Sequence, residues 1–319
     1  MRIEFFRRDS LARRRLMVSC GLVVLLVPGT SLWPIASLFA QKRARPDTTI
    51  WSGQSGGFIL NWTTADITAF PVDQPSKVVF SAREIALKKF DAFKKENPQS
   101  DSSWRCSYSL RFAVLSFVGS LLSYEENEDS YCGSVNGGGW NHPSDQIRYH
   151  TIDLNQPNLP ITLTKYISET SLLEALLADL TVKKALRDAG NTVKPKSITS
   201  LVKAINEGAE IKPTKSSAEA PKECGFVFPD HPFAEFAFHH IENDRIAVSF
   251  SLEPNSGACH SAHSQLGILL AIPESLKESL IAAQSRTQGL LMERERRVAL
   301  GKATLFEFET SEPKRNGKR

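Results

Sequence analysis

The chain has 319 residues, 41% of them hydrophobic and 23% charged, which is the length and composition of a folded protein with a sizeable core. Its 39 Lys and Arg residues exceed its 35 Asp and Glu residues, but residues 1–40 contain six of the former and two of the latter. The rest of the chain carries 33 of each, and this balance excludes a basic nucleic-acid-binding surface.

The first forty residues have the pattern of a secretory signal. A cationic block from Arg7 to Arg15 precedes an uncharged apolar run, Leu16–Val27, and the small Ala40 stands where a signal peptidase would cut. The alternative is an uncleaved anchor, because residues 16–40 are long enough to cross a bilayer despite two prolines. Both readings predict a periplasmic or secreted body that contacts the membrane at most through this segment.

The cysteines fit an oxidising compartment. Cys20 lies in the signal, and the mature part keeps Cys106, Cys132, Cys224 and Cys259, an even number that predicts two disulfides with three possible pairings. We expect Cys106 to pair with Cys132 and Cys224 with Cys259, because each pair closes a short loop around a strand-rich segment. A four-cysteine zinc site is the alternative, but the sequence has no close CxxC pair to support it.

The first half of the mature part alternates between extended and helical patterns. Residues 41–75 predict a linker with one or two short strands. Ser81 and Glu84 form a capping box that begins a helix, which ends at Asn97 before a proline. The apolar run Tyr108–Tyr124, rich in β-branched and aromatic residues, predicts one strand buried on both faces and bent at its glycine.

A glycine-rich loop and two helices come next. The segment 132–143 predicts a loop, and Ile147–Leu154 alternates as a strand. Ser171 begins a second capping box for a leucine-rich helix that continues to Leu186 and ends at a glycine. Another helix is expected from Ile198 to a glycine at position 208.

The last third returns to strands after a polar linker at 211–223. Strands are expected over Phe233–His240, Ile246–Leu252 and Leu266–Ile272, of which the second alternates cleanly between apolar and polar residues. A helix follows Pro273, and the charged end of the chain is expected to be an extension.

These elements predict an α+β fold with antiparallel or mixed sheets, since strands and helices are segregated and the strands are joined by turns. The domain is expected to cover residues 76–285 in two parts, 76–208 and 224–285. Residues 286–319 form the charged extension.

Four segments, in this order, resemble a known family. The segments are the helix from Ser81 to Lys95, the strand motif Phe112–Phe117 running into Leu122–Tyr124, the loop Gly137–Pro143 followed by Tyr149–Asn155, and Ile161–Ile167 before a leucine-rich helix. In these segments the chain is similar to the extracytoplasmic domain shared by RsiV-type anti-sigma factors and PdaC-type peptidoglycan deacetylases. The closing segments Val248–Pro254 and Leu266–Pro273 also fit, so the resemblance covers about residues 76–285.

The resemblance implies a non-catalytic binding or sensing domain of the cell envelope, with cell-wall glycan or a lytic enzyme such as lysozyme as the expected ligand. The sequence departs from the family at Lys165, where an acidic residue is usual, and at Trp140-Asn141, which widens the loop. The four cysteines are outside the family pattern. No deacetylase catalytic domain is recognisable.

The glycine-rich loop is the predicted ligand-binding site. Glycines expose backbone N–H groups, and a tryptophan can stack on a sugar or a protein partner. The candidate residues are Gly137, Gly138, Gly139, Trp140, Asn141 and His142. A plain turn is the alternative. No cofactor is expected, because no phosphate-loop Lys-Ser follows the glycines.

A small hydrolase is the alternative function. Its nucleophile would be Cys259 with His260 or His263 as the base, or Cys132 with His142. The disulfides expected for all four cysteines argue against it.

A zinc-dependent variant of that hydrolase would use His260 and His263, with His142 or His239 as a further ligand. Surface histidines on loops are the simpler interpretation, since no carboxylate stands nearby. The acidic run from Glu125 to Asp129 could attract a cationic partner, although such runs are usually solvated faces.

Overall fold

The computed structural model describes residues 47–97, 104–134, 144–190, 193–209, 225–254, 265–293 and 303–310. The chain divides into two units by its contacts, residues 1–44 and 45–319, and the architecture below is that of the second. Every strand pair among the described residues is antiparallel, which confirms the α+β prediction. No helix in these ranges combines the length and hydrophobicity needed to cross a membrane.

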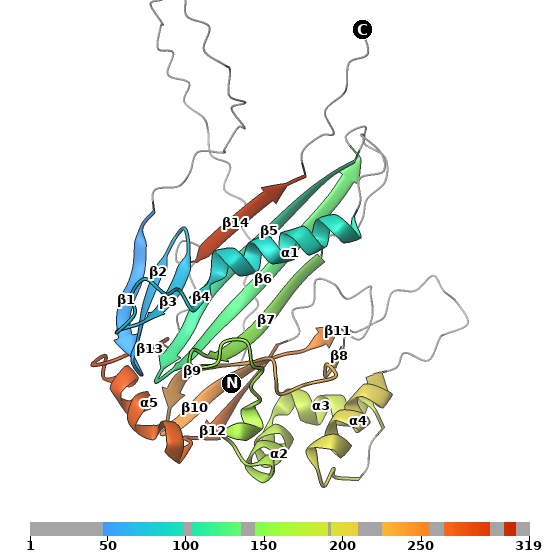
Figure 1. Ribbon diagram of the computed structural model, residues 1–319. Coiled ribbons are helices and arrows are strands. Elements are labelled where there is room, and N and C mark those ends of the chain that lie inside the picture. The colour runs from blue at the N-terminus through green and yellow to red at the C-terminus, as the bar shows by residue number, and fades with distance from the viewer. Residues whose placement is uncertain are drawn as a thin grey trace, which may run out of the picture. The chain divides into compact units, whose positions relative to one another are not determined.

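A long hairpin is the centre of the structure (Figure 1). It belongs to a five-stranded sheet in which the central strands pair in the order β5, β6, β7, while two short strands pair with the outer edge of β5. The strands are β5 (Trp104–Val118), β6 (Leu121–Ser134), β7 (Ser144–Asp153), β13 (Leu290–Leu291) and β14 (Thr304–Glu309).

The apolar run Tyr108–Tyr124 was predicted as one strand, and this prediction is wrong. The chain reverses at Gly119-Ser120, so the run contributes the adjoining ends of β5 and β6. Gly119 has a φ of +58°, a left-handed conformation that glycine adopts at little cost. The run is apolar on both strands because each of them is covered on both faces at this end.

One face of the long hairpin is covered by a small sheet and a helix. The sheet pairs in the order β1-β2-β3-β4, and α1 follows it directly. Their apolar side chains form one core with those of the hairpin, including Leu60, Phe112 and Tyr124. The elements are β1 (Thr49–Ser55), β2 (Phe58–Thr63), β3 (Ile67–Pro71), β4 (Phe80–Ser81) and α1 (Ala82–Glu96).

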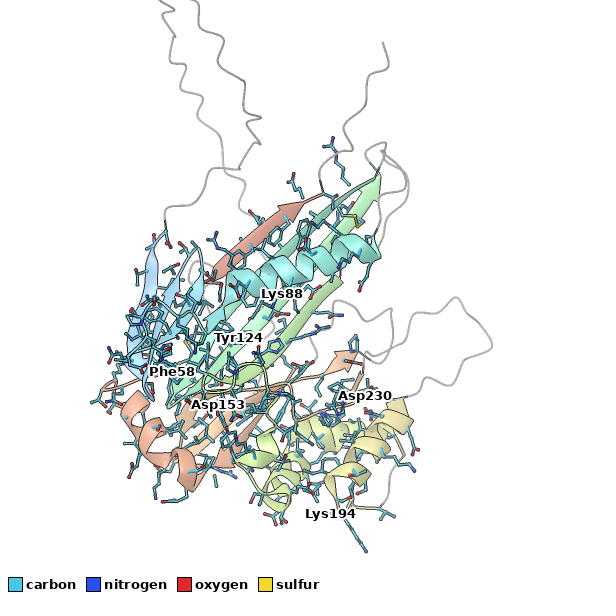
Figure 2. All side chains as sticks on the ribbon, in the orientation of Figure 1. Phe58, Lys88, Tyr124, Asp153, Lys194 and Asp230 are labelled. Atoms are coloured by element: carbon cyan, nitrogen blue, oxygen red, sulfur yellow. A yellow bond between two sulfur atoms is a disulfide. The ribbon has the colours of Figure 1, made fainter. Side chains whose placement is uncertain are left out.

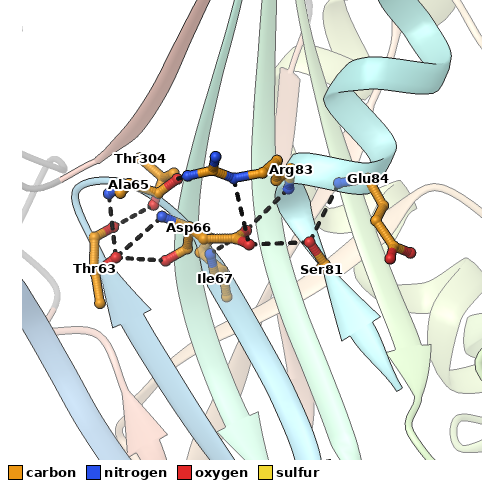
Figure 3. A network of polar contacts seen from close by, with 8 residues as sticks. All are labelled: Thr63, Ala65, Asp66, Ile67, Ser81, Arg83, Glu84 and Thr304. Atoms are coloured by element: carbon orange, nitrogen blue, oxygen red, sulfur yellow. Dashed lines mark hydrogen bonds and ion pairs between the residues drawn. The ribbon is translucent and has the colours of Figure 1, made fainter. Parts of the chain in front are cut away.

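A polar network fixes the start of α1 to the turn between β2 and β3 (Figure 3). Ser81 is the N-cap and accepts a hydrogen bond from the Glu84 N–H, as predicted, and the helix ends at Asn97. Asp66 accepts hydrogen bonds from the Ser81 hydroxyl at 3.0 Å and the Arg83 N–H at 2.9 Å. The carboxylate lies at the positive end of the helix dipole, where it is stabilising.

The other face of the hairpin meets a second layer of strands and helices. A three-stranded sheet pairs in the order β12-β10-β9, and β8 pairs with β11. Ile246, Val248 and Phe250 are fully buried on one face of β10, which confirms the predicted alternation. The strands are β8 (Phe226–Val227), β9 (Phe236–Glu242), β10 (Arg245–Ser251), β11 (Glu253–Pro254) and β12 (Gln265–Ala271).

Helices pack against this second layer and complete its core. The leucine-rich helix predicted from Ser171 is two helices, because Asp179 interrupts it and caps the next one by accepting the N–H of Thr181 and of Val182. The helices are η1 (Leu163–Lys165), α2 (Glu169–Ala178), α3 (Leu180–Asp188), α4 (Ile198–Ala209), η3 (Glu274–Leu276) and α5 (Lys277–Gln284).

Buried hydroxyl groups join the two layers. The Thr151 hydroxyl on β7 donates to the Phe236 carbonyl at 2.8 Å, so the Ser123 hydroxyl on β6 donates to Thr151 at 2.9 Å. The Phe238 N–H donates in turn to Ser123 at 3.2 Å. Through these bonds, side-chain hydroxyls of the hairpin sheet satisfy backbone groups of β9, and this fixes where the two layers meet.

Candidate functional site

The predicted ligand-binding loop connects β6 to β7. Its six candidate residues, Gly137 to His142, lie outside the described residues, and so do Cys224, Cys259, His260 and His263. The structure does describe the two strands from which the loop leaves, up to Ser134 and from Ser144.

A disulfide ties the base of the loop. Cys106 and Cys132 face each other across β5 and β6 and are bonded to one another, which confirms this half of the predicted pairing. Both are buried, with exposed fractions of 5% and 7%. The Cys106 N–H donates to the Thr310 hydroxyl, and the Thr310 N–H donates to the Cys106 carbonyl, both at 3.0 Å. The end of β14 is thus joined to the same point.

The disulfide removes one version of the hydrolase alternative. A cysteine nucleophile must be a free thiolate, and the sulfur of Cys132 is bonded to Cys106. The hypothesis that Cys132 and His142 form a catalytic pair is therefore wrong. The version that uses Cys259 stays a prediction, because that residue is outside the described ranges.

A charged cluster that the sequence did not reveal lies beneath α1. It consists of Lys89 on α1, Glu126 and Glu128 on β6, and His150 on β7. The ring of His150 stacks on that of Tyr124, which is labelled in Figure 2. The Lys89 ammonium group donates to Glu126 and lies 3.5 Å from Glu128. The Glu126 side chain is only 2% exposed, so its charge is compensated in the interior.

The histidine of this cluster is neutral near pH 7. Burial, with a smaller contribution from Lys89, lowers the pKa of His150 to about 4. Its ring stacks on Tyr124 with centroids 5.0 Å apart, and its Nε2 lies 3.7 Å from a Glu126 oxygen without a hydrogen-bond partner. Burial and the Glu126 charge also raise the pKa of Tyr124. The cluster holds α1 on the sheet through one cation shared by two carboxylates.

The acidic run therefore behaves differently from the prediction of a solvated face. Residues 125–129 lie on a strand, where side chains alternate between faces. Glu126 and Glu128 point toward α1, while Glu125 points to the opposite face, where its carboxylate lies 3.9 Å from Arg111. The two-residue spacing of Glu126 and Glu128 was the signal in the sequence that places both side chains on one face of a strand.

Two adjacent histidines occupy a β-bulge in β9. His239 and His240 both lie opposite Ala247, and their Nδ1 atoms are 2.6 Å apart. Burial and the neighbouring His240 lower the pKa of His239 to about 4. Glu242 lies 3.6 Å from the other nitrogen of His240, so the two rings and this carboxylate do not converge on one point. Within the described ranges, no group of three or more His, Cys, Asp or Glu side chains could hold a metal ion.

Comparison with known proteins adds no family to these observations. No protein-family model matches the chain, and no curated protein matches it in sequence. The similarity to the extracytoplasmic envelope domains stays a prediction based on the motifs quoted above.

Proposed function

We propose that the chain is an exported, non-catalytic binding module of the cell envelope, with wall glycan or a lytic enzyme such as lysozyme as its ligand. The Cys106–Cys132 disulfide carries the proposal. Disulfides of this kind persist in oxidising compartments and are rare in the cytosol. The disulfide is consistent with the leader-like residues 1–40, which point to the same compartment.

The place of the disulfide supports binding through the loop between β6 and β7. Recognition loops are effective when a rigid scaffold holds their ends. Here three strands, β5, β6 and β14, are joined at the loop base by the disulfide and by hydrogen bonds between Cys106 and Thr310. Trp140 and its neighbouring glycines then supply a stacking group and backbone donors on that scaffold.

Binding is tested with the chain purified after export to the periplasm of an expression host. Two probes are used, namely insoluble peptidoglycan in a co-sedimentation assay and immobilised hen egg-white lysozyme in a biosensor assay. We expect the chain to bind one of them and Trp140→Ala to weaken that binding by about tenfold, the loss that removal of one stacking contact produces. Leu180→Ala is the control, because Leu180 is 78% exposed on α3.

Failure of the unmodified chain to bind either probe would overturn the proposal. Equal binding by Trp140→Ala and the parent chain would remove the loop from it. Mass spectrometry of the same preparation without reductant checks the compartment. Four oxidised cysteines and a chain that begins at residue 41, or an intact membrane-bound leader, agree with export, whereas four free thiols contradict it.

A further inference from the structure

A second candidate site lies at the opposite end of the long hairpin. A cavity of about 490 Å³ opens between the edge strand β1 and the segment that follows α5. This volume is typical of small-molecule sites. Its walls include Trp51, Ser52, Gly53 and Gln54 on β1 and residues 286–293 on the other side.

The two walls are held at a fixed separation. The Gly289 N–H donates to the Gln54 carbonyl at 2.8 Å, and the next two residues pair with β5 as β13. Gly289 has a φ of +78°, and a Cβ there would collide with the Phe117 carbonyl. Only glycine fits so closely against β5, and the cavity is therefore a formed feature of the fold.

Trp51 forms the aromatic wall of the cavity. Its ring lies over Gly53, since a Cβ at position 53 would come within 2.5 Å of the indole atom Cζ2. The ring also meets Phe117 edge-on, with centroids 6.2 Å apart. Gly53 is in the interior of a strand, where glycine is unfavourable, and the space it leaves for the indole accounts for its presence.

Polar groups surround this aromatic wall. Arg286 and Glu293 form an ion pair at the rim, with side chains 77% and 52% exposed, and Gln288 lies between them in sequence. The N–H and C=O groups of Ser52 point to the same side of β1 as those of Gln54, away from β2, because residues two apart in an antiparallel ladder share an orientation. The cavity thus combines one aromatic stacking surface with hydrogen-bond donors and acceptors from both side chains and the backbone.

We propose that this cavity is a saccharide-binding subsite. An aromatic ring stacks on the C–H face of a pyranose, and planar polar side chains bond its hydroxyl groups. A phosphate is disfavoured, because the charge of Arg286 is compensated by Glu293. An added peptide strand is disfavoured, because the Gln54 carbonyl at the edge of β1 is already bonded to Gly289. The inference rests on the proposed function only in taking a glycan as ligand.

The subsite is far from the loop base. Cys106 and Phe117 are eleven residues apart on β5, which corresponds to roughly 36 Å along the strand. A polymeric glycan can span this distance, whereas a single sugar cannot. Binding at two points would raise the apparent affinity for the polymer above that for a short oligosaccharide.

The test measures the affinity of the exported chain for chitotetraose and cellotetraose by calorimetry. We expect binding of at least one of them, weakened about tenfold by Trp51→Ala and also weakened by Gly53→Ala, which displaces the indole. Gly267→Ala is the matched control, because Gly267 is also in a strand and has no atom within 4 Å of its added Cβ. Thermal unfolding of each variant verifies that it is folded, and Trp51→Phe is expected to retain part of the binding.

The outcomes separate the two sites. The subsite is overturned if folded Trp51→Ala and Gly53→Ala bind the oligosaccharides as well as the parent chain does. It is also overturned if the parent chain binds neither oligosaccharide, or if it binds an extended peptide instead. Lysozyme binding that depends on Trp140 would then still support the proposed function. Oligosaccharide binding that depends on Trp51 but not on Trp140 supports the subsite, and the loop is then judged by the peptidoglycan and lysozyme assays alone.

Discussion

Removal of the Cys106–Cys132 disulfide tests how the loop base is stabilised. The two cysteines are 26 residues apart in sequence. In the chain-entropy account a cross-link that closes a loop of this length stabilises the folded state by about 3.5 kcal/mol, because it restricts the unfolded chain. Residual β5–β6 pairing in the unfolded state would reduce this gain, so we expect a loss of about 2–4 kcal/mol for Cys106→Ala/Cys132→Ala.

The measurement is urea unfolding followed by circular dichroism, from which the free energy of unfolding is extrapolated. The parent chain and the Cys106→Ala/Cys132→Ala variant are compared in a Cys224→Ala/Cys259→Ala background, so that neither of those cysteines can form a disulfide with Cys106 or Cys132. Limited proteolysis adds a local readout, since cleavage between β6 and β7 is expected to become faster once the strands at the loop base can separate. A stability difference below about 1 kcal/mol, with unchanged cleavage, would refute the reasoning.

Three further changes probe the supports of the site. The pKa of His150 is about 4 in the folded protein and about 6.5 for an unfolded histidine, so the unfolded state takes up the proton first as the pH falls and stability drops between these values. His150→Gln should remove about 2–3 kcal/mol of this drop, measured by urea unfolding at pH 7 and pH 4. Asp66→Asn should lower the free energy of unfolding by about 1–2 kcal/mol, because Asp66 caps the start of α1, whereas Asp91→Asn on the exposed side of α1 should leave the unfolding curve unchanged. Identical unfolding curves for the two variants would contradict this. Gly56→Ala should lower the melting temperature more than Gly57→Ala, because both glycines have positive φ but only the first would bring a Cβ against the β5–β6 turn; the opposite order would contradict the packing.

Local patterns predicted the elements whose signals are contained in a few neighbouring residues. The capping box at Ser81 located the start of α1, and Asn97 located its end, because N–H groups at a helix start need nearby acceptors. Strict alternation located β10, because one of its faces is buried and the other is partly exposed. The Cys106–Cys132 pairing also followed from the short spacing of the two cysteines in the sequence.

Features that depend on contacts distant in sequence were not predicted. The turn at Gly119-Ser120 lacks the Asn-Gly or Asp-Gly signature, and apolar residues continue on both sides of it, so nothing local distinguishes a hairpin from one long strand. The burial of Glu126 depends on Lys89, 37 residues earlier, and becomes visible only when α1 is placed over β6. Trp51 and Gly53 fell in a segment interpreted as a linker with one or two short strands, although they form one wall of a cavity.

The long hairpin gives these separate features a common logic. One end carries the disulfide and the loop with Trp140, the middle carries Glu126 and the cation that holds α1, and the other end supports Gly289 and the wall of the Trp51 cavity. A single pair of strands, covered on both faces near Gly119, fixes the distance between the Trp51 cavity and the disulfide at the base of the loop. The two binding sites that we propose at these two ends would together suit a ligand that is itself extended and repetitive. Of the ligands that we propose, wall glycan is the extended and repetitive one. If both sites bind one glycan strand, Trp51→Ala and Trp140→Ala should each weaken the binding of the polymer more than the binding of the tetramer.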